Sequence, residues 1–233
     1  MAGPPGAGKT GNDARVLVLA HRGANRLARE NTVAAFTAAG ALGADGVELD
    51  VQLSADGVPV VHHDAAVEDV GAIAELTFAD LPEWVPTLAG AIDACAAMAL
   101  VNVEIKDPLA VAPTAAVLDG HGPAGAEVAC IVSSFELSTI DAHRRAAPAV
   151  PTAWLTLPGV DQLEALATAG ERGHSALHSH HTAVSPELVR AAHDRGMRIG
   201  TWTVNDPARA AELEAMGVDV LITDVPDVVR RRA

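Results

Sequence analysis

Short apolar runs rich in β-branched residues alternate along the chain with Ala-rich segments whose apolar positions recur at helical spacing. The runs predict nine strands, at residues 16–20, 46–51, 58–61, 101–105, 128–132, 152–155, 176–178, 198–204 and 218–222. The Ala-rich segments include predicted helices at 32–41, 186–194 and 207–216, each of which a following glycine would end: Gly43, Gly196 and Gly217. Strands that alternate with helices indicate parallel β/α units.

The connection between the second and third predicted strands sets the architecture. It contains only Ser54-Ala55-Asp56-Gly57, whereas a parallel neighbour needs a crossover of about a dozen residues or more. The third strand therefore returns antiparallel, which leaves eight parallel strands, the number in a TIM barrel. We predict a single α/β domain, a (β/α)8 TIM barrel over residues 15–233 with an extra β-hairpin arm after strand 2, preceded by a flexible N-terminal segment at 1–14.

Residues 3–10 read GPPGAGKT and match the pattern of a phosphate-binding loop. Such a loop needs a strand before it and a helix after it, because the first N–H groups of the helix bind the phosphates. Only Met1 and Ala2 precede the glycine, and the next run predicts a strand. We therefore do not expect a nucleotide site. The nucleotide-binding alternative predicts that deletion of the first twelve residues abolishes ATP or GTP binding.

The net charge of −14 narrows the choice of partners, because an anionic surface repels nucleic acid and anionic membranes. We expect no nucleic-acid partner, and an anionic substrate would need a local cation. Cys95 and Cys130 lie in apolar stretches and are expected to be reduced thiols in the core. The sequence shows neither a signal-peptide pattern nor an apolar run of membrane-spanning length. A cytoplasmic protein without stable membrane insertion is expected, and its oligomeric state is not predicted.

Polar residues gather where the predicted barrel strands end, and in this fold the carboxyl ends of the strands carry the chemistry. His21 and Arg22 follow the first strand. Glu48 and Asp50 are two residues apart on the second strand, so their side chains point the same way. The next barrel strand ends in Glu104 and Lys106 with the same spacing, so two same-face polar pairs point into the barrel mouth.

The hairpin arm adds a histidine to this group. If the turn is Ser54 to Gly57, the pairing places His63 opposite Glu48. A slip by one residue would bring His62 forward instead. Because successive strand residues face opposite ways, we expect His63 to face the site and His62 to face away.

Three carboxylates in one place repel each other unless a cation lies among them, and an all-oxygen ligand set suits Mg²⁺ or Ca²⁺. We therefore predict one divalent metal ion bound by Glu48, Asp50 and Glu104. His21 and His63 would supply a general acid and a general base, and Arg22 and Lys106 would bind phosphate oxygens. Metal, cations and imidazoles together indicate phosphodiester cleavage. The sequence does not say which histidine is the acid, or whether water or a substrate hydroxyl attacks.

The chain resembles the glycerophosphodiester phosphodiesterase family. The matching motifs follow in the family's order from about residue 18 almost to the end: His21-Arg22-Gly23, Glu30-Asn31-Thr32, Glu48-Leu49-Asp50, His63-Asp64, Val103-Glu104-Ile105-Lys106, Ser133-Ser134-Phe135, Trp202-Thr203-Val204-Asn205 and Thr223-Asp224. The resemblance implies a phosphoric diester hydrolase that converts small glycerophosphodiesters to glycerol 3-phosphate and an alcohol. It implies the same metal, histidine and phosphate roles, with Trp202 lining the substrate pocket.

The later cluster His174, His178, His180 and His181 lacks the spacing of a metal site and is predicted to be a solvated loop. His178, which lies near a strand end, is a candidate for substrate contact.

The sequence departs from the family after His63-Asp64. The family continues with an Arg-Thr-Thr element, a glycine-rich stretch and a small inserted region, whereas residues 65–71 here read AAVEDVG and the insertion is reduced. We expect a more open site to accept larger headgroups or lipids such as lysophospholipids. The alternatives are therefore a lysophospholipase D-type enzyme that acts on lysophospholipids, and a barrel that binds phosphodiesters without turnover.

Overall fold

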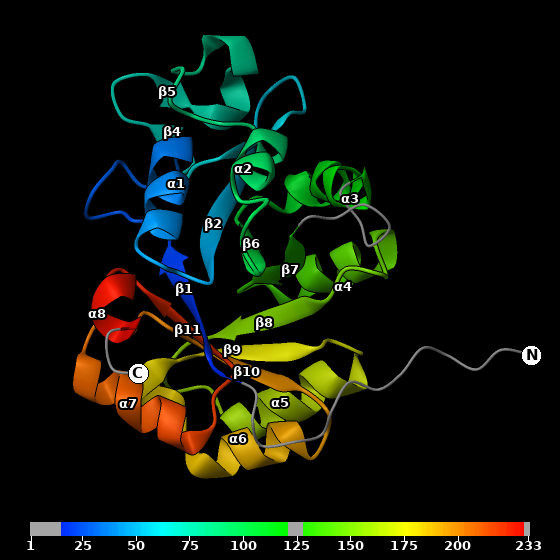
Figure 1. The fold of residues 1–233 in the computed structure, drawn as a ribbon. Helices are drawn as coiled ribbons and strands as arrows, with labels where there is room; N and C mark the ends of the chain where they lie inside the picture. The colour runs from blue at the N-terminus through cyan, green and yellow to red at the C-terminus, as the bar shows by residue number, and fades with distance from the viewer. Residues whose placement is uncertain (1–14, 121–127, 231–233) are drawn as a thin grey trace, which may run out of the picture.

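Eight parallel strands form a closed barrel in the computed structural model, which describes residues 15–120 and 128–230 (Figure 1). The barrel strands are β1 (Leu17–His21), β2 (Gly46–Leu53), β6 (Leu100–Ile105), β7 (Ala129–Ser134), β8 (Thr152–Thr156), β9 (Ala176–His180), β10 (Arg198–Trp202) and β11 (Val220–Thr223). The ring closes because β1 pairs in parallel with both β2 and β11. The predicted TIM barrel is thus confirmed, and each predicted strand lies within two residues of an observed one at its start.

Helices surround the barrel, as the predicted β/α alternation requires (Figure 1). They are α1 (Val33–Ala41), α2 (Leu88–Ala94), α3 (Val111–Gly120), α4 (Leu137–Ala146), α5 (Gln162–Glu171), α6 (Pro186–His193), α7 (Pro207–Met216) and α8 (Pro226–Arg230). The side chain of Ser185 caps the first turn of α6, and that of Asp206 caps α7. Gly217 ends α7 with φ of 88°, a left-handed conformation that glycine adopts without a steric cost.

The apolar core lies mainly between the strands and the helices. One buried cluster joins β2 and β6 to α1 and α2, and includes Phe36, Leu49 and Val103. A second joins β9, β10 and β11 to α5, α6 and α7, and includes Leu166 and Leu213. Because both faces of each strand are covered, the barrel strands are rigid supports for the side chains at their carboxyl ends.

β3 (Pro59–Val61) pairs antiparallel with β2, which confirms the hairpin arm, but the predicted register is wrong by one residue. The pairs are Val51 with Val61 and Leu53 with Pro59, so the connection has five residues rather than four. Ser54 explains the extra residue, because its Oγ accepts a hydrogen bond from the Val58 N–H at 3.0 Å. Ser54 and Val58 therefore close the turn around Gly57.

The segment between β3 and α2 projects beyond the barrel (Figure 1). It holds a small hairpin that the sequence did not predict, β4 (Ala66–Val67) with β5 (Gly71–Ala72), and two 3-10 turns, Ile73–Glu75 and Phe78–Asp80. A separate apolar cluster packs it on the hairpin arm: Val60, Val67, Ile73, Leu81 and Val85. Further 3-10 turns, Pro108–Ala110 and His181–Ala183, follow β6 and β9.

Three other predictions concern the cysteines, residues 3–10 and membrane insertion. Both cysteines are free; Cys95 is buried and Cys130 is partly buried. The phosphate-loop pattern at residues 3–10 lies outside the described residues. None of the described helices has the length and apolar character that crossing a bilayer requires.

Candidate active site

Three buried carboxylates meet inside the carboxyl end of the barrel. Glu48 and Asp50 extend from the same face of β2, and Glu104 extends from β6, where it pairs with Asp50. One oxygen of each carboxylate lies within 4.8 Å of the others. The strand positions predicted this convergence, since residues two apart share a face and parallel neighbours in register lie side by side.

The electrostatics of this trio favour a bound cation. Burial and the neighbouring Asp50 carboxylate raise the pKa of Glu48 to about 8. The same two causes raise the pKa of Glu104. Positive charge brought close to carboxyl groups with raised pKa values favours their ionised form. A donor set of buried carboxylate oxygens therefore fits a divalent metal ion of the hard, oxygen-binding type.

Positive side chains border the trio on two sides. Arg22 Nε lies 3.2 Å from Asp50 Oδ2, and Lys106 Nζ donates to Glu104 Oε1 at 3.0 Å. Asn31 donates from Nδ2 to Asp50 Oδ2 at 2.8 Å, a role that was not predicted from the sequence. Arg22 and Asn31 both have left-handed backbones, with φ of 58° and 57°, which non-glycine residues rarely adopt. These loop conformations turn both side chains toward Asp50.

His21 is held between two acidic residues. Its Nδ1 lies 2.7 Å from Asp224 Oδ1, and its Nε2 lies 3.9 Å from Glu48 Oε2. Asp224 also accepts hydrogen bonds from Asn25 at 2.7 Å and from Asn205 at 2.6 Å. Burial lowers the pKa of His21, but the Asp224 hydrogen bond and the Glu48 charge outweigh it, so the pKa is raised. The three hydrogen bonds outweigh burial at Asp224 and lower the pKa of that carboxyl.

His63 follows β3 and reaches the site despite the wrong register. Its Nε2 lies 3.4 Å from Lys106 Nζ, and its Nδ1 lies 2.7 Å from Asp64 Oδ1. His62 points elsewhere, with its ring 5.9 Å from that of Trp84. This placement agrees with the expectation that His62 faces away. Both histidines follow the end of β3 at Val61, where the chain turns.

A pocket of about 280 Å³ opens over the carboxylates. Its polar wall is formed by His21, Arg22, Glu48, His63, Asn102, Glu104, Lys106 and Thr203. Its apolar wall is formed by Phe135, Leu155, Leu157, Trp202 and Ile222. Trp202 packs edge-on against Phe135 at 5.3 Å and donates from Nε1 to the His178 carbonyl at 3.0 Å. The structure thus brings all but one of the predicted site residues together, with Asp50 beneath them.

His178 is the exception, because the structure does not place it where it could contact a substrate in the pocket. It is buried on β9, and it is not among the described residues that line the pocket. Its ring packs so closely on Gly200 that a Cβ there would lie 2.4 Å from it. His174 is also buried, with Nδ1 2.8 Å from Thr152 Oγ1, so the prediction of a solvated loop is wrong for these two histidines.

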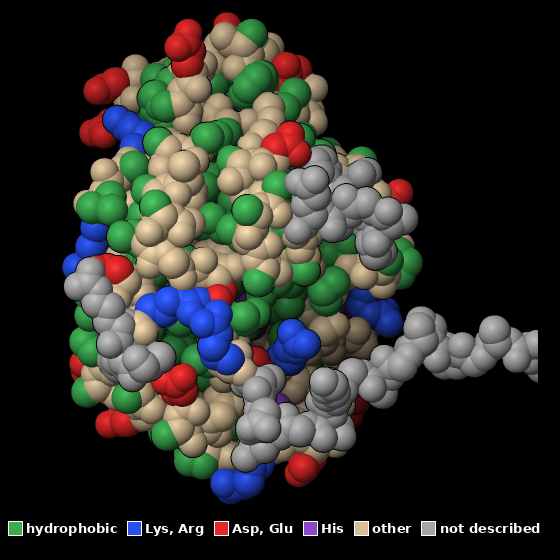
Figure 2. Space-filling view, in the orientation of Figure 1, with side chains coloured by type: hydrophobic (Ala, Val, Ile, Leu, Met, Phe, Trp, Pro, Cys, Tyr) green, Lys and Arg blue, Asp and Glu red, His purple; other side chains and the backbone are tan. Residues whose placement is uncertain are grey.

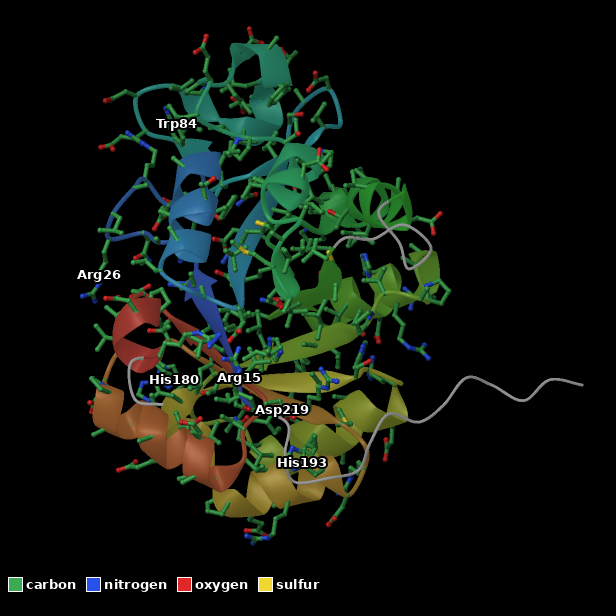
Figure 3. All side chains as sticks on the ribbon, viewed as in Figure 1. Arg15, Arg26, Trp84, His180, His193 and Asp219 are labelled. Atoms are coloured by element: carbon green, nitrogen blue, oxygen red, sulfur yellow. The ribbon has the colours of Figure 1, made fainter. Side chains whose placement is uncertain are left out.

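A second, larger cavity of about 730 Å³ lies beside the first and shares His63 with it. Charged and polar side chains dominate its lining: Arg29, Glu30, Asn31, His62, Asp64, Glu68 and Asp69. Trp84 lines it too, with Arg29 lying 4.1 Å above the ring. In Figure 3, Trp84 beside this cavity and His180, whose ring packs on Trp202 beside the first, lie well apart. The two cavities therefore extend in different directions from His63, which lines both.

The chain is similar in sequence and in structure to known phosphodiesterases. The glycerophosphoryl diester phosphodiesterase family model matches residues 21–228. The Bacillus subtilis protein YhdW is 32% identical over 92% of this chain and 96% of its own length. A glycerophosphodiester phosphodiesterase of Caldanaerobacter subterraneus is 30% identical over 92% of this chain and 96% of its own. An Oleispira antarctica phosphodiesterase, solved with the product sn-glycerol-3-phosphate, superposes with a TM-score of 0.81 at 26% identity, over 92% of this chain and 95% of that one.

Proposed function

Because the chain belongs to the glycerophosphoryl diester phosphodiesterase family, whose members are phosphoric diester hydrolases, we propose that it hydrolyses glycerophosphodiesters to glycerol 3-phosphate and an alcohol. The observation that carries the proposal is the buried carboxylate trio, flanked in one pocket by two histidines and two cationic side chains. Each of these groups has a task in phosphodiester cleavage.

Glu48, Asp50 and Glu104 are the proposed ligands of one divalent ion, Mg²⁺ or Ca²⁺. Hard cations of this kind bind oxygen donors, and the trio offers only oxygen. When bound, such an ion polarises phosphoryl oxygens and lowers the pKa of a coordinated hydroxyl or water. Asn31 fixes Asp50 from both sides, because its Oδ1 also accepts from the Asp50 N–H at 3.3 Å.

Arg22 and Lys106 are the proposed phosphate contacts. Both line the pocket and both stand beside the carboxylates, so a phosphate that enters meets positive charge on two sides. Glu30 accepts from Arg22 at 2.9 Å and holds its guanidinium in place. Charge that develops on the phosphoryl oxygens in the transition state is stabilised by donors already in position.

His21 and His63 are the proposed acid–base pair. Each has one ring nitrogen beside a carboxylate, Asp224 for His21 and Asp64 for His63, so the other nitrogen, Nε2, is directed toward the pocket side. One imidazole accepts the proton of the attacking hydroxyl, and the other donates a proton to the departing alkoxide. Either a water molecule or the substrate's own glycerol hydroxyl serves as the nucleophile in this scheme.

The neutral and apolar part of the pocket is the proposed glycerol site. Trp202 and Phe135 offer apolar ring surface, and Thr203 offers polar groups beside it. A volume of about 280 Å³ suits a small molecule. Glycerol 3-phosphate, the product bound in the Oleispira antarctica relative, is a ligand of that size class.

The test is release of glycerol 3-phosphate from glycerophosphocholine by chelator-treated protein to which Mg²⁺ or Ca²⁺ is added back. His63→Ala should lower kcat about a hundredfold or more, because it removes a proton-transfer group. His62→Ala is the matched control, since the neighbouring ring packs on Trp84 and should leave kcat nearly unchanged. Asp50→Asn should shift the metal titration to higher concentration.

Two outcomes would contradict the proposal. No release with any metal from folded protein would favour the barrel that binds phosphodiesters without turnover. Equal activities of the His62→Ala and His63→Ala variants would remove His63 from the chemistry.

A further inference from the structure

A buried amide oxygen beside the catalytic pocket has no hydrogen-bond partner among the described residues. It is Oδ1 of Asn102, a residue of β6 that is 1% exposed and that lines the pocket. The other end of the amide is held, because Nδ2 donates to Ser133 Oγ at 3.1 Å. Most buried polar side-chain atoms in proteins are hydrogen-bonded. An unsatisfied acceptor at the wall of a pocket therefore points to a ligand that satisfies it.

Asn102 lies at the floor of the pocket. Lys106, Glu104 and Asn102 are two residues apart from one another along β6 and the residue after its end, so their side chains share one face. A strand rises about 3.3 Å per residue, so each step is about 7 Å deeper into the barrel. The proposed phosphate contact is thus uppermost, the proposed metal ligand is below it, and the amide is deepest.

The floor suits an uncharged part of the substrate. Leu155 and Ile222 share the pocket with Asn102 and offer only apolar surface. The cavity of about 730 Å³ beyond His63 has the contrary character, and Figure 2 shows acidic side chains over the segment between β3 and α2 that borders it. The glycerol arm of a glycerophosphodiester carries no charge, so it fits the floor, and the headgroup arm then lies on the side of His63.

We propose that Asn102 is a specificity-determining residue whose Oδ1 accepts a hydrogen bond from the terminal hydroxyl of the glycerol moiety. The inference rests on the proposed phosphodiesterase function and assigns a further residue to the same site. With the phosphate held near Arg22 and Lys106, the hydroxyl farthest from phosphorus enters deepest. This hydroxyl leaves water on binding and needs a new acceptor for its proton. The amide supplies one without adding negative charge beside the carboxylates.

The experiment compares glycerophosphocholine with 2-hydroxypropyl phosphocholine, which lacks only the terminal hydroxyl and keeps the hydroxyl next to it. Choline release measures cleavage of both compounds. We expect kcat/KM of the unaltered protein to be about tenfold higher or more for glycerophosphocholine, because a site that binds a hydroxyl discriminates against an analogue without it. Asn102→Val removes the acceptor, keeps a side chain suited to a strand, and should bring the two values close together.

Thr201 on β10 offers a matched control. It is also fully buried and its Oγ1 has no partner among the described residues, but it does not belong to the described lining of the pocket. Thr201→Val removes that atom and should keep the preference of the unaltered protein. A change that only disturbs packing lowers both activities together. The ratio of the two kcat/KM values therefore separates recognition of the hydroxyl from a structural role.

The outcomes separate this inference from the proposed function. Equal kcat/KM values for the two compounds with the unaltered protein would overturn the inference and leave the function standing. A preference that survives in Asn102→Val, or that is lost equally in Thr201→Val, would also overturn it. If Asn102→Val does not fold, Asn102→Ser takes its place, because its side chain is too short to reach the same hydroxyl.

Calorimetry decides if neither compound is cleaved. About tenfold tighter binding of glycerol 3-phosphate than of 2-hydroxypropyl phosphate to the unaltered protein, lost in the Asn102 variant, supports the inference although the proposed function fails. Equal affinities of the two phosphates for the unaltered protein refute it.

Discussion

Asp224 controls the orientation of His21 although it belongs to the last strand end of the barrel. Its Oδ1 faces the imidazole and accepts from Asn25, while its Oδ2 accepts from Asn205. With both oxygens engaged, the carboxylate cannot rotate away from His21. It fixes which ring nitrogen carries the proton and favours the charged imidazolium.

Asp224→Asn should therefore lower kcat about 10- to 100-fold with a smaller effect on KM, as loss of an orienting partner usually does. Because the negative charge raises the pKa of His21, its removal lowers that pKa. The limb of the pH–rate profile that reports His21 should move to lower pH. Steady-state kinetics from pH 5 to 9 would check this. Asp56→Asn in the hairpin turn is the control, and an unmoved profile in Asp224→Asn would contradict the orienting role.

The sequence could predict some site residues and not others for a physical reason. Glu48, Asp50 and Glu104 lie on strands, where alternation fixes the direction of each side chain. Asn31 and Asp224 act from loops, and the left-handed φ of Asn31 has no clear signal in sequence. His178 shows the converse, since a position near a strand end did not say whether the ring points into the pocket or beneath it.

At the level of elements, regular periodicity was predictable and short or irregular structure was not. The barrel strands are buried β-branched runs, and glycines mark the helix ends, so both appear in the sequence with clear boundaries. The hairpin β4–β5 has two residues in each strand, which is too short to show alternation. The hairpin register depended on Ser54, whose side-chain hydrogen bond lengthened the turn by one residue.

Two glycines give an element-scale prediction. A Cβ on Gly46 would lie 1.8 Å from the Leu100 carbonyl oxygen, so Gly46→Ala must separate β2 from β6. We expect a loss of at least about 3 kcal/mol in the free energy of unfolding, or failure to fold. Gly57→Ala in the hairpin turn meets nothing within 4 Å and bears only the strain of its φ of 79°, about 1 kcal/mol. Urea denaturation of both variants would check this, and equal losses would contradict it.

At the level of the whole molecule, buried neutral histidines set the stability in acid. Burial lowers the pKa of His143 and of His178 to about 4. In the unfolded chain the same groups titrate near pH 6.5, so the unfolded state takes up their protons first as the pH falls. The folded state therefore loses stability progressively between about pH 6.5 and pH 4.

His143→Leu should flatten this dependence. The residue lies buried on α4, and neither ring nitrogen has a hydrogen-bond partner among the described residues. Between pH 7 and pH 4.5 the unaltered protein should lose about 2 to 3 kcal/mol through this residue alone, and the variant should not. Urea denaturation at the two pH values would measure the difference. The same loss in both proteins would show that His143 is not the group responsible.

The closing strand of the barrel also has a consequence for synthesis. β11 pairs with β1, and Asp224 directly after β11 meets His21 directly after β1, across 203 positions of the chain. Asp45 accepts from Arg15 before β1 and from Arg230 at the end of α8, which joins the two ends again at the amino ends of the strands. A nascent chain on the ribosome holds all three carboxylates well before it holds Asp224. Hydrolytic activity should thus appear only after Asp224 has been translated, so a chain terminated before this residue is inactive as well as open.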